Sequence, residues 1–183
     1  VGPRVLIYKQ DPSVTEIGVR KAFLPGYVTT GPRDARITYG PPGLPAVSPN
    51  AFGDFIQTPG TDSFDAVHTF AVVRLTLTMY QRALATGGVA AVVPWQWNSP
   101  TNTDPLDVFP HAGETMNAYY MRSAKCLKFF YFRKPGDPPT AAYKYTGRSL
   151  DIVAHEAGHA VLDGLKPNWL LGSAPPQTGG LHE

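Results

Sequence analysis

The chain has 183 residues, of which 43% are hydrophobic and 16% are charged. This length predicts one domain, with room for a small appended lobe, and the apolar fraction is sufficient for a hydrophobic core. The 16 basic and 14 acidic residues leave a net charge of only +2, which is too small for binding nucleic acid or an anionic membrane by charge. No apolar run approaches the roughly 20 residues of a membrane span. We therefore expect neither nucleic acid nor a membrane among its partners.

The N-terminal third reads as short strands joined by turns. Residues 4–9 alternate around an apolar run and predict a strand, and shorter strands are expected at 16–19, 22–24 and 36–39. Residues 40–49 are rich in proline and glycine. That composition fits a loop crossing the surface of one domain or a linker, and the sequence leaves both open.

A long helix is predicted next, over residues 62–86. Asp62 is its expected N-cap and Gly87-Gly88 its end. Apolar residues recur three and four apart, the spacing of one helical face; they are Phe70, Val73, Leu77, Tyr80 and Leu84. His68 lies near the start of this helix without a partner at ligand spacing, so we interpret it as structural or solvated.

Further strands are expected in the middle of the chain. The predicted segments are 89–97, 108–111, 116–121 and 124–132, the last containing the single cysteine, Cys126, as a small apolar residue. Together with a second helix described below, these elements predict an α+β fold. We expect a twisted, largely antiparallel sheet packed on two long helices.

The second helix is predicted from the sequence SLDIVAHEAGHAVLD, residues 149–163. Ser149 is a suitable N-cap, Asp151 places a carboxylate in the first turn, and Gly164 followed by Pro167 marks the end. The helix is apolar along much of its body, so the side chains it carries sit on a largely buried element. A buried helix holds its polar groups in fixed positions.

Two histidines on this helix can share one metal ion. His155 and His159 are four residues apart, so they lie on the same face, about 6 Å apart along the axis. Glu156 is rotated about 100° from His155, which keeps it out of the same coordination shell but within reach of a water on the metal. That is the position of a general base in metal-assisted hydrolysis.

A hydrolytic zinc site needs a third protein ligand and one open position. Glu183 is the natural candidate, with 23 residues between it and His159. Glu114, His68 and His111 are less well placed in the sequence. Two histidines and a glutamate leave a zinc-bound water with a pKa around 7, so the chemistry implied is peptide-bond hydrolysis.

The stretches DIVAHEAGHAVLD and GGLHE together resemble the metal-binding core of the thermolysin-like zinc metallopeptidases, the gluzincins. In that family a helix bearing HExxH is followed by a second helix that supplies a glutamate. The resemblance implies Zn²⁺ as cofactor, with His155, His159 and Glu183 as ligands and Glu156 as general base. It also implies a peptide or protein substrate, cleaved before bulky apolar side chains, and favours a secreted protein.

Two further matches extend the resemblance. Asp151 stands where the family often has a calcium-binding aspartate, which implies Ca²⁺ or a structural role at this position. Asn117, Ala118, Tyr119 and Tyr120 resemble the family's edge strand, whose asparagine and backbone hold the substrate. An exposed edge suits a protease because an extended peptide can add to it as another strand.

The chain also departs from the family pattern. There is no tyrosine from Ala160 to His182, where the family has one that stabilises the oxyanion, and Trp169 is the only aromatic residue there. His182 stands where asparagine is common, and Glu183 is the last residue. We therefore expect residues 1–183 to be the N-terminal domain of a larger peptidase, truncated at the third zinc ligand, with its C-terminal helical domain as a missing partner. These residues alone are expected to be inactive. Two alternatives stay open: a catalytically lapsed zinc-binding or interaction domain, and a structural fragment without a metal.

Overall fold

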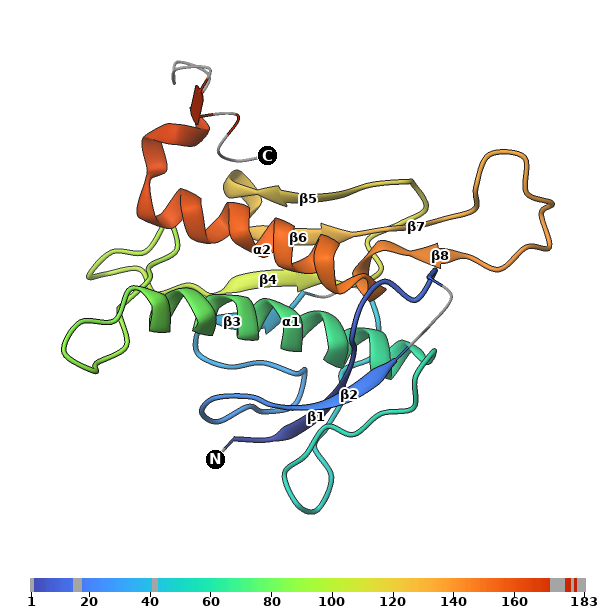
Figure 1. Ribbon diagram of the computed structural model, residues 1–183, viewed down its shortest axis with the longest axis horizontal. Coiled ribbons are helices and arrows are strands. Elements are labelled where there is room, and N and C mark those ends of the chain that lie inside the picture. The colour runs from blue at the N-terminus through green and yellow to red at the C-terminus, as the bar shows by residue number, and fades with distance from the viewer. Residues whose placement is uncertain (1, 15–17, 41–42, 172–176, 179, 181–183) are drawn as a thin grey trace.

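The computed structural model describes residues 2–14, 18–40, 43–171, 177–178 and 180. It is an α+β protein in which two helices, α1 (Asp62–Ala83) and α2 (Leu150–Leu165), pack against each other and over a four-stranded sheet (Figure 1). Helix α1 contacts the sheet at β3, and α2 contacts it at β5 and β6. None of the helices in the described ranges is long and apolar enough to cross a membrane.

Eight strands form three small sheets within the described residues. They are β1 (Arg4–Tyr8), β2 (Val19–Phe23), β3 (Ile37–Tyr39), β4 (Leu106–Phe109), β5 (Ala118–Met121), β6 (Cys126–Phe129), β7 (Tyr131–Phe132) and β8 (Lys144–Tyr145). Strands β1 and β2 pair as an antiparallel ribbon, and so do β7 and β8. Three 3₁₀ turns also lie among the described residues, at Arg122–Ala124, Thr146–Arg148 and Pro167–Leu170.

The four-stranded sheet has the order β3-β4-β6-β5 and is mixed. Strand β4 is parallel to both β3 and β6, and only the β5–β6 pair is antiparallel. The prediction of a largely antiparallel sheet is therefore wrong for this sheet. The reason is α1, which lies between β3 and β4 in the chain: a helical crossover returns the chain to the edge where the first strand began, and this produces a parallel pair.

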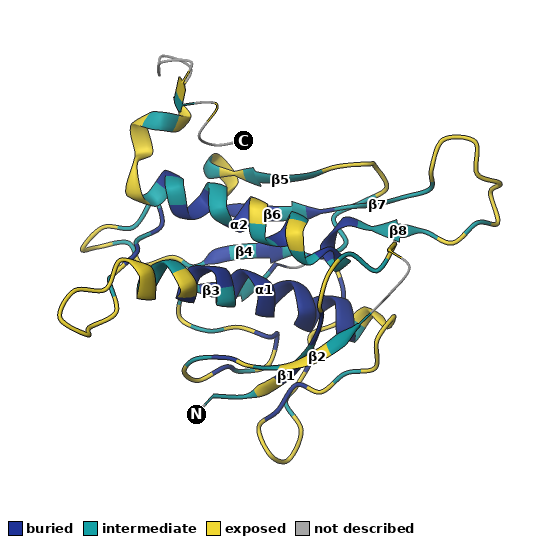
Figure 2. Ribbon diagram, in the orientation of Figure 1, coloured by how far each residue is buried: buried dark blue, intermediate teal, exposed yellow. Residues whose placement is uncertain are grey.

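Helix α1 is buried around most of its circumference rather than along one stripe. The β1–β2 ribbon, strand β3 and helix α2 all contact it, and residues 64–74 are buried without a break, the dark stretch of α1 in Figure 2. Its N-cap is Thr61, whose side chain accepts from the Phe64 N–H, and not Asp62. The helix ends at Ala83, three residues before the predicted end, and Leu84 beyond it is 46% exposed.

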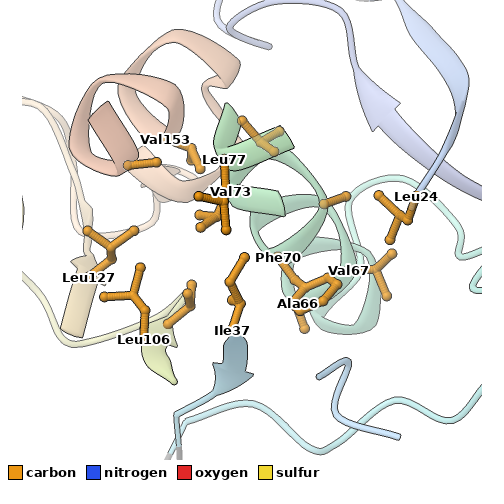
Figure 3. Packing of buried hydrophobic residues seen from close by; sticks show 14 of the residues in the cluster. Leu24, Ile37, Ala66, Val67, Phe70, Val73, Leu77, Leu106, Leu127 and Val153 are labelled. Atoms are coloured by element: carbon orange, nitrogen blue, oxygen red, sulfur yellow. The ribbon is translucent and has the colours of Figure 1, made fainter. Parts of the chain in front are cut away.

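The hydrophobic core lies between the helices and the sheet (Figure 3). Val73 and Leu77 of α1 and Val153 of α2 face Leu106 of β4 and Leu127 of β6 in one buried cluster. These are aliphatic side chains from elements far apart in the sequence. Burying one such side chain contributes roughly 1.5–3 kcal/mol.

The apolar segment 89–97 is not a strand, contrary to prediction. Val93 and Trp95 are buried, but the segment makes no ladder beyond one isolated bridge of Val89 with Thr86. Pro94 cannot donate a ladder hydrogen bond, and the indole N–H of Trp95 donates instead to the Arg36 carbonyl at 2.7 Å. Within this segment only Val93 and Trp95 are buried in the core, whereas Val89 and Val92 are 72% and 85% exposed.

The other predicted strands are present with shifted bounds. Strand β2 replaces the two short segments at 16–19 and 22–24, although 15–17 lie outside the described residues. The predicted strand 124–132 divides into β6 and β7. Cys126 is buried in β6 and His68 is buried in α1, so both take the structural roles expected of them.

Candidate metal centre

Helix α2 forms as its terminal residues predict. The Ser149 side chain accepts from the Ile152 N–H at 3.4 Å, and Asp151 lies in the first turn. The helix runs one residue past Gly164, to Leu165, before Pro167 begins a 3₁₀ turn. At Gly164 the helix backbone lies so close to the loop before Trp95 that an added Cβ would stand 2.0 Å from the Pro94 carbonyl oxygen.

The two histidines of α2 converge on one point. The Nε2 atoms of His155 and His159 are 2.9 Å apart, and their rings meet edge to face with centroids 4.4 Å apart. With metal–nitrogen distances near 2.0–2.1 Å, two ligands of a tetrahedral zinc ion stand about 3.3 Å apart. A small rotation of the two rings would bring the Nε2 atoms from 2.9 Å to this ligand–ligand distance. The two imidazole nitrogens therefore fit Zn²⁺ as ligands.

Glu156 completes this group from the buried side of the helix. Its carboxylate, together with one nitrogen of each histidine, forms a set of ligating atoms within 4.8 Å of one another. The residue is 8% exposed, whereas His155 is exposed and His159 half-buried. Its Oε2 accepts the Tyr120 main-chain N–H at 3.0 Å, so the carboxylate lies between α2 and strand β5.

Strand β5 is the last strand of its sheet, and its outer edge faces this carboxylate. The Tyr120 N–H points to Glu156, and the Ala118 N–H is bonded to Asn117 Oδ1 at 2.9 Å. In an antiparallel pair the residues alternate in which side their main-chain groups face. Ala118 and Tyr120 thus present theirs at the open edge, while Tyr119 and Met121 bond to β6.

Two hollows flank the candidate ligands along β5. One, of about 530 Å³, is lined by Met116, Asn117, Ala118, Phe132, Thr146, Asp151, Ile152, His155 and Glu156. The other, of about 340 Å³, is lined by Ala118, Tyr119, Tyr120, His155, Glu156, His159 and Leu170. Because the two hollows share Ala118, His155 and Glu156, they form one groove that runs past the candidate metal position.

The sequence reasoning missed a network that fixes β5 to α2. The Tyr120 hydroxyl donates to Asp163 Oδ2 at 2.8 Å, and Arg122 donates from Nε to the same oxygen at 2.8 Å and from its terminal nitrogen to Oδ1. Asp163 is fully buried. Burial first, and then the bond to Asp163, raises the pKa of Tyr120, and the same carboxylate raises the pKa of Arg122.

A signal for this network was present in the sequence. Asp163 stands four residues after His159, on the same helical face, as the one acidic residue in the apolar last turns of the helix, residues 160–165. Such a carboxylate is buried only when it is paired. An arginine directly after the strand that faces the helix was the partner to look for.

Some predicted site residues stand apart from this group. Asp151 is exposed and lines the larger hollow, but it belongs to neither group of three ligating side chains found among the described residues. The Asn117 side-chain oxygen is turned back onto the next amide and its carbonyl accepts from Thr146 Oγ1. Glu183 lies outside the described residues.

The weaker candidates for a third ligand are engaged elsewhere. Glu114 accepts from the Tyr143 hydroxyl at 3.0 Å, and the Nδ1 of His68 accepts from the Tyr8 N–H at 3.3 Å. His111 lies 2.9 Å from Asp65 Oδ2. Asp62, Asp65 and His111 form a second group of ligating atoms, but the Arg148 guanidinium already binds both oxygens of Asp65.

Comparison with known proteins finds no significant match to a family model, a curated protein or a solved structure.

Proposed function

We propose that the chain binds Zn²⁺ through His155 and His159 as part of a zinc endopeptidase, in which Glu156 is the general base for peptide-bond hydrolysis. The observation that carries this proposal is the convergence of the two Nε2 atoms, 2.9 Å apart, beside a buried carboxylate at the open edge of a strand. Glu183 is the proposed third ligand, in keeping with the thermolysin-like resemblance. A sheet packed on two helices, one bearing HExxH, supports a zincin-like fold.

Each group of the site has a role that follows from its position. When bound, zinc would polarise the scissile carbonyl and lower the pKa of a water. Before a peptide binds, Glu156 is held at the strand edge by the Tyr120 N–H, and it accepts a proton from that water once the peptide has taken its place on this N–H. An extended peptide pairs with the outward main-chain groups of Ala118 and Tyr120, displacing the side-chain oxygens that hold them. Its backbone then lies beside the two histidines.

The groove also supports a substrate class. Met116, Phe132 and Ile152 give the larger hollow an apolar lining next to His155. A bulky apolar side chain beside the scissile bond gains roughly 25 cal/mol for each Å² that it buries there. We propose cleavage next to such side chains, in agreement with the family preference.

A second candidate is a zinc-binding or interaction domain that no longer catalyses. The observation that favours it is the absence of tyrosine from Ala160 to His182, because an oxyanion donor contributes roughly 10²–10³ in kcat. The two candidates share the metal and differ in turnover. They are separated by measuring zinc content and peptide cleavage on the same samples.

The decisive experiment compares the parent chain with Glu156→Gln. The amide can still accept the Tyr120 N–H but cannot take a proton, so we expect zinc to be retained and kcat to fall by about 10²–10⁴. Glu114→Gln, on an exposed glutamate outside the groove, is the matched control and should leave both unchanged. His155→Ala should lose the zinc.

Two results would count against the peptidase. Equal cleavage by the parent and Glu156→Gln would show that Glu156 is not the general base. Zinc binding without cleavage by either would favour the second candidate. If the chain continues past Glu183 in its gene, the same measurements are made on the longer form.

A further inference from the structure

A separate hollow, of about 590 Å³, lies against helix α1, and it shares no lining residue with the groove beside His155. It opens between the middle of α1, at Arg74, and the loop of residues 25–36. Its charged lining consists of Arg33, Asp34, Arg36 and Arg74, and Tyr27, which is 84% exposed, also lines it. Three guanidinium groups therefore share one carboxylate.

That carboxylate, of Asp34, is already hydrogen-bonded to the main chain of its own loop. Asp34 Oδ1 accepts the main-chain N–H groups of Arg36 at 2.7 Å and Ile37 at 2.9 Å. Its other oxygen lies 3.6 Å from a terminal nitrogen of Arg74, with both side chains 10% exposed. Asp34 thus neutralises at most one of the three cations, and the hollow keeps a surplus of two positive charges.

The two inner guanidinium groups are fixed in place but incompletely paired. Arg36 donates to the Val93 carbonyl at 2.7 Å and lies 5.1 Å from the centroid of the Trp95 ring. Arg74 donates to Gln81, yet its buried Nε has no hydrogen-bond partner in the described part of the chain. Burial lowers the pKa of both, and for Arg36 the neighbouring Arg74 lowers it further. An unpaired buried donor of this kind is costly unless a ligand satisfies it.

The third guanidinium is available at the mouth of the hollow. Arg33 is exposed, and its main chain is held by a reciprocal pair of hydrogen bonds with Thr29, at 2.9 and 3.1 Å. Over the ranges that the structure covers, its guanidinium has no ion pair. Arginine forks match the oxygens of phosphate with paired, charge-assisted hydrogen bonds.

We propose that this hollow is an anion site that binds a phosphate monoester or a similar dianion between Arg33, Arg36 and Arg74. A dianion balances the surplus of two charges and supplies acceptors for the unpaired Arg74 Nε. The volume leaves room for a group beyond the phosphate, against the exposed ring of Tyr27. Because arginine stays protonated at every working pH, binding persists at pH 8, where histidines are neutral.

The test uses inorganic phosphate as probe, at pH 8 and constant ionic strength, with chloride as the reference anion. Calorimetric titration gives Kd, and thermal unfolding gives the stabilisation that accompanies binding. Arg33→Gln and Arg74→Met remove one guanidinium each. Arg82→Gln removes the same charge from an exposed residue in the last turn of α1 and is the matched control.

We expect phosphate to bind the parent and Arg82→Gln alike, and to bind Arg33→Gln and Arg74→Met about ten-fold more weakly or worse. The proposed site is overturned if phosphate binds and stabilises the parent no more than chloride does. It is also overturned if phosphate binds Arg33→Gln and Arg82→Gln with equal affinity. Arg33 is exposed and its variant should fold, so that comparison decides even where Arg74→Met does not fold. Binding of acetate in preference to phosphate would overturn the dianion class.

Discussion

The buried histidine of α1 should make the protein's stability depend on pH. His68 is fully buried, its ring stacks on Phe64 at 5.8 Å between centroids, and its Nδ1 accepts the Tyr8 N–H. Burial lowers its pKa from 6.5 to about 4, against a smaller opposing effect of Asp65. The neutral ring is therefore the form that the fold accommodates.

The sign and size of the effect follow from the two pKa values. In the unfolded chain His68 takes a proton below about pH 6.5, whereas in the fold it does so only near pH 4. Between these two pH values the unfolded state binds more protons than the folded state. The contribution of His68 to the stability of the fold is therefore fully present above pH 6.5 and is lost as the pH falls towards 4. At about 1.4 kcal/mol for each pH unit, the loss amounts to about 3 kcal/mol.

The assay is urea unfolding of the parent and His68→Gln at several values between pH 7.5 and pH 4. Glutamine can accept the Tyr8 N–H and does not titrate, so the difference between the two free energies of unfolding isolates His68 from every other group. We expect the parent's advantage to shrink by about 3 kcal/mol over this range. An advantage that stays constant from pH 7.5 to pH 4 would refute the reasoning.

Two pairs of substitutions test the packing around the groove by chemical denaturation. Gly164→Ala forces a Cβ to within 2.0 Å of a backbone oxygen and should destabilise the fold by about 1–3 kcal/mol or more. Gly158→Ala, in the same helix with open space around it, should stabilise by about 0.5–1 kcal/mol; losses of equal size would contradict the close approach. Tyr120→Phe takes a hydrogen bond from the buried Asp163 and should cost about 1–3 kcal/mol. Tyr119→Phe, on the other face of β5, should be nearly neutral, and equal costs for the two tyrosines would argue against the network.

The parts of the structure that follow local rules were predictable from the sequence. Ser149 caps α2, and the four-residue spacing puts His155 and His159 on one face, because both features depend only on helix geometry and on neighbours in the chain. The position of α1 follows from its apolar spacing for the same reason, although the helix ends at Ala83, three residues before the predicted end. Its cap at Thr61 instead of Asp62 is a local choice between two adjacent residues that both accept hydrogen bonds well.

The parts that were missed depend on contacts between distant residues. Apolar residues in 89–97 predict burial, but only the position of Arg36 decides that Trp95 bonds there and not in a ladder. The parallel pairing of β4 depends on where α1 returns the chain. The bond between Arg122 and Asp163 joins residues 41 apart, and no spacing rule reaches that far.

The two side-chain oxygens at the edge of β5 also bear on how the protein behaves at high concentration. An unpaired strand edge is a template for association with other copies, which many proteins block with charge or bulk. Here the outward N–H groups of Ala118 and Tyr120 are already occupied, by Asn117 and by Glu156. The same carboxylate that would serve hydrolysis therefore guards the strand against self-association. A second chain that pairs with this edge must first replace both bonds, and this cost opposes association between two copies.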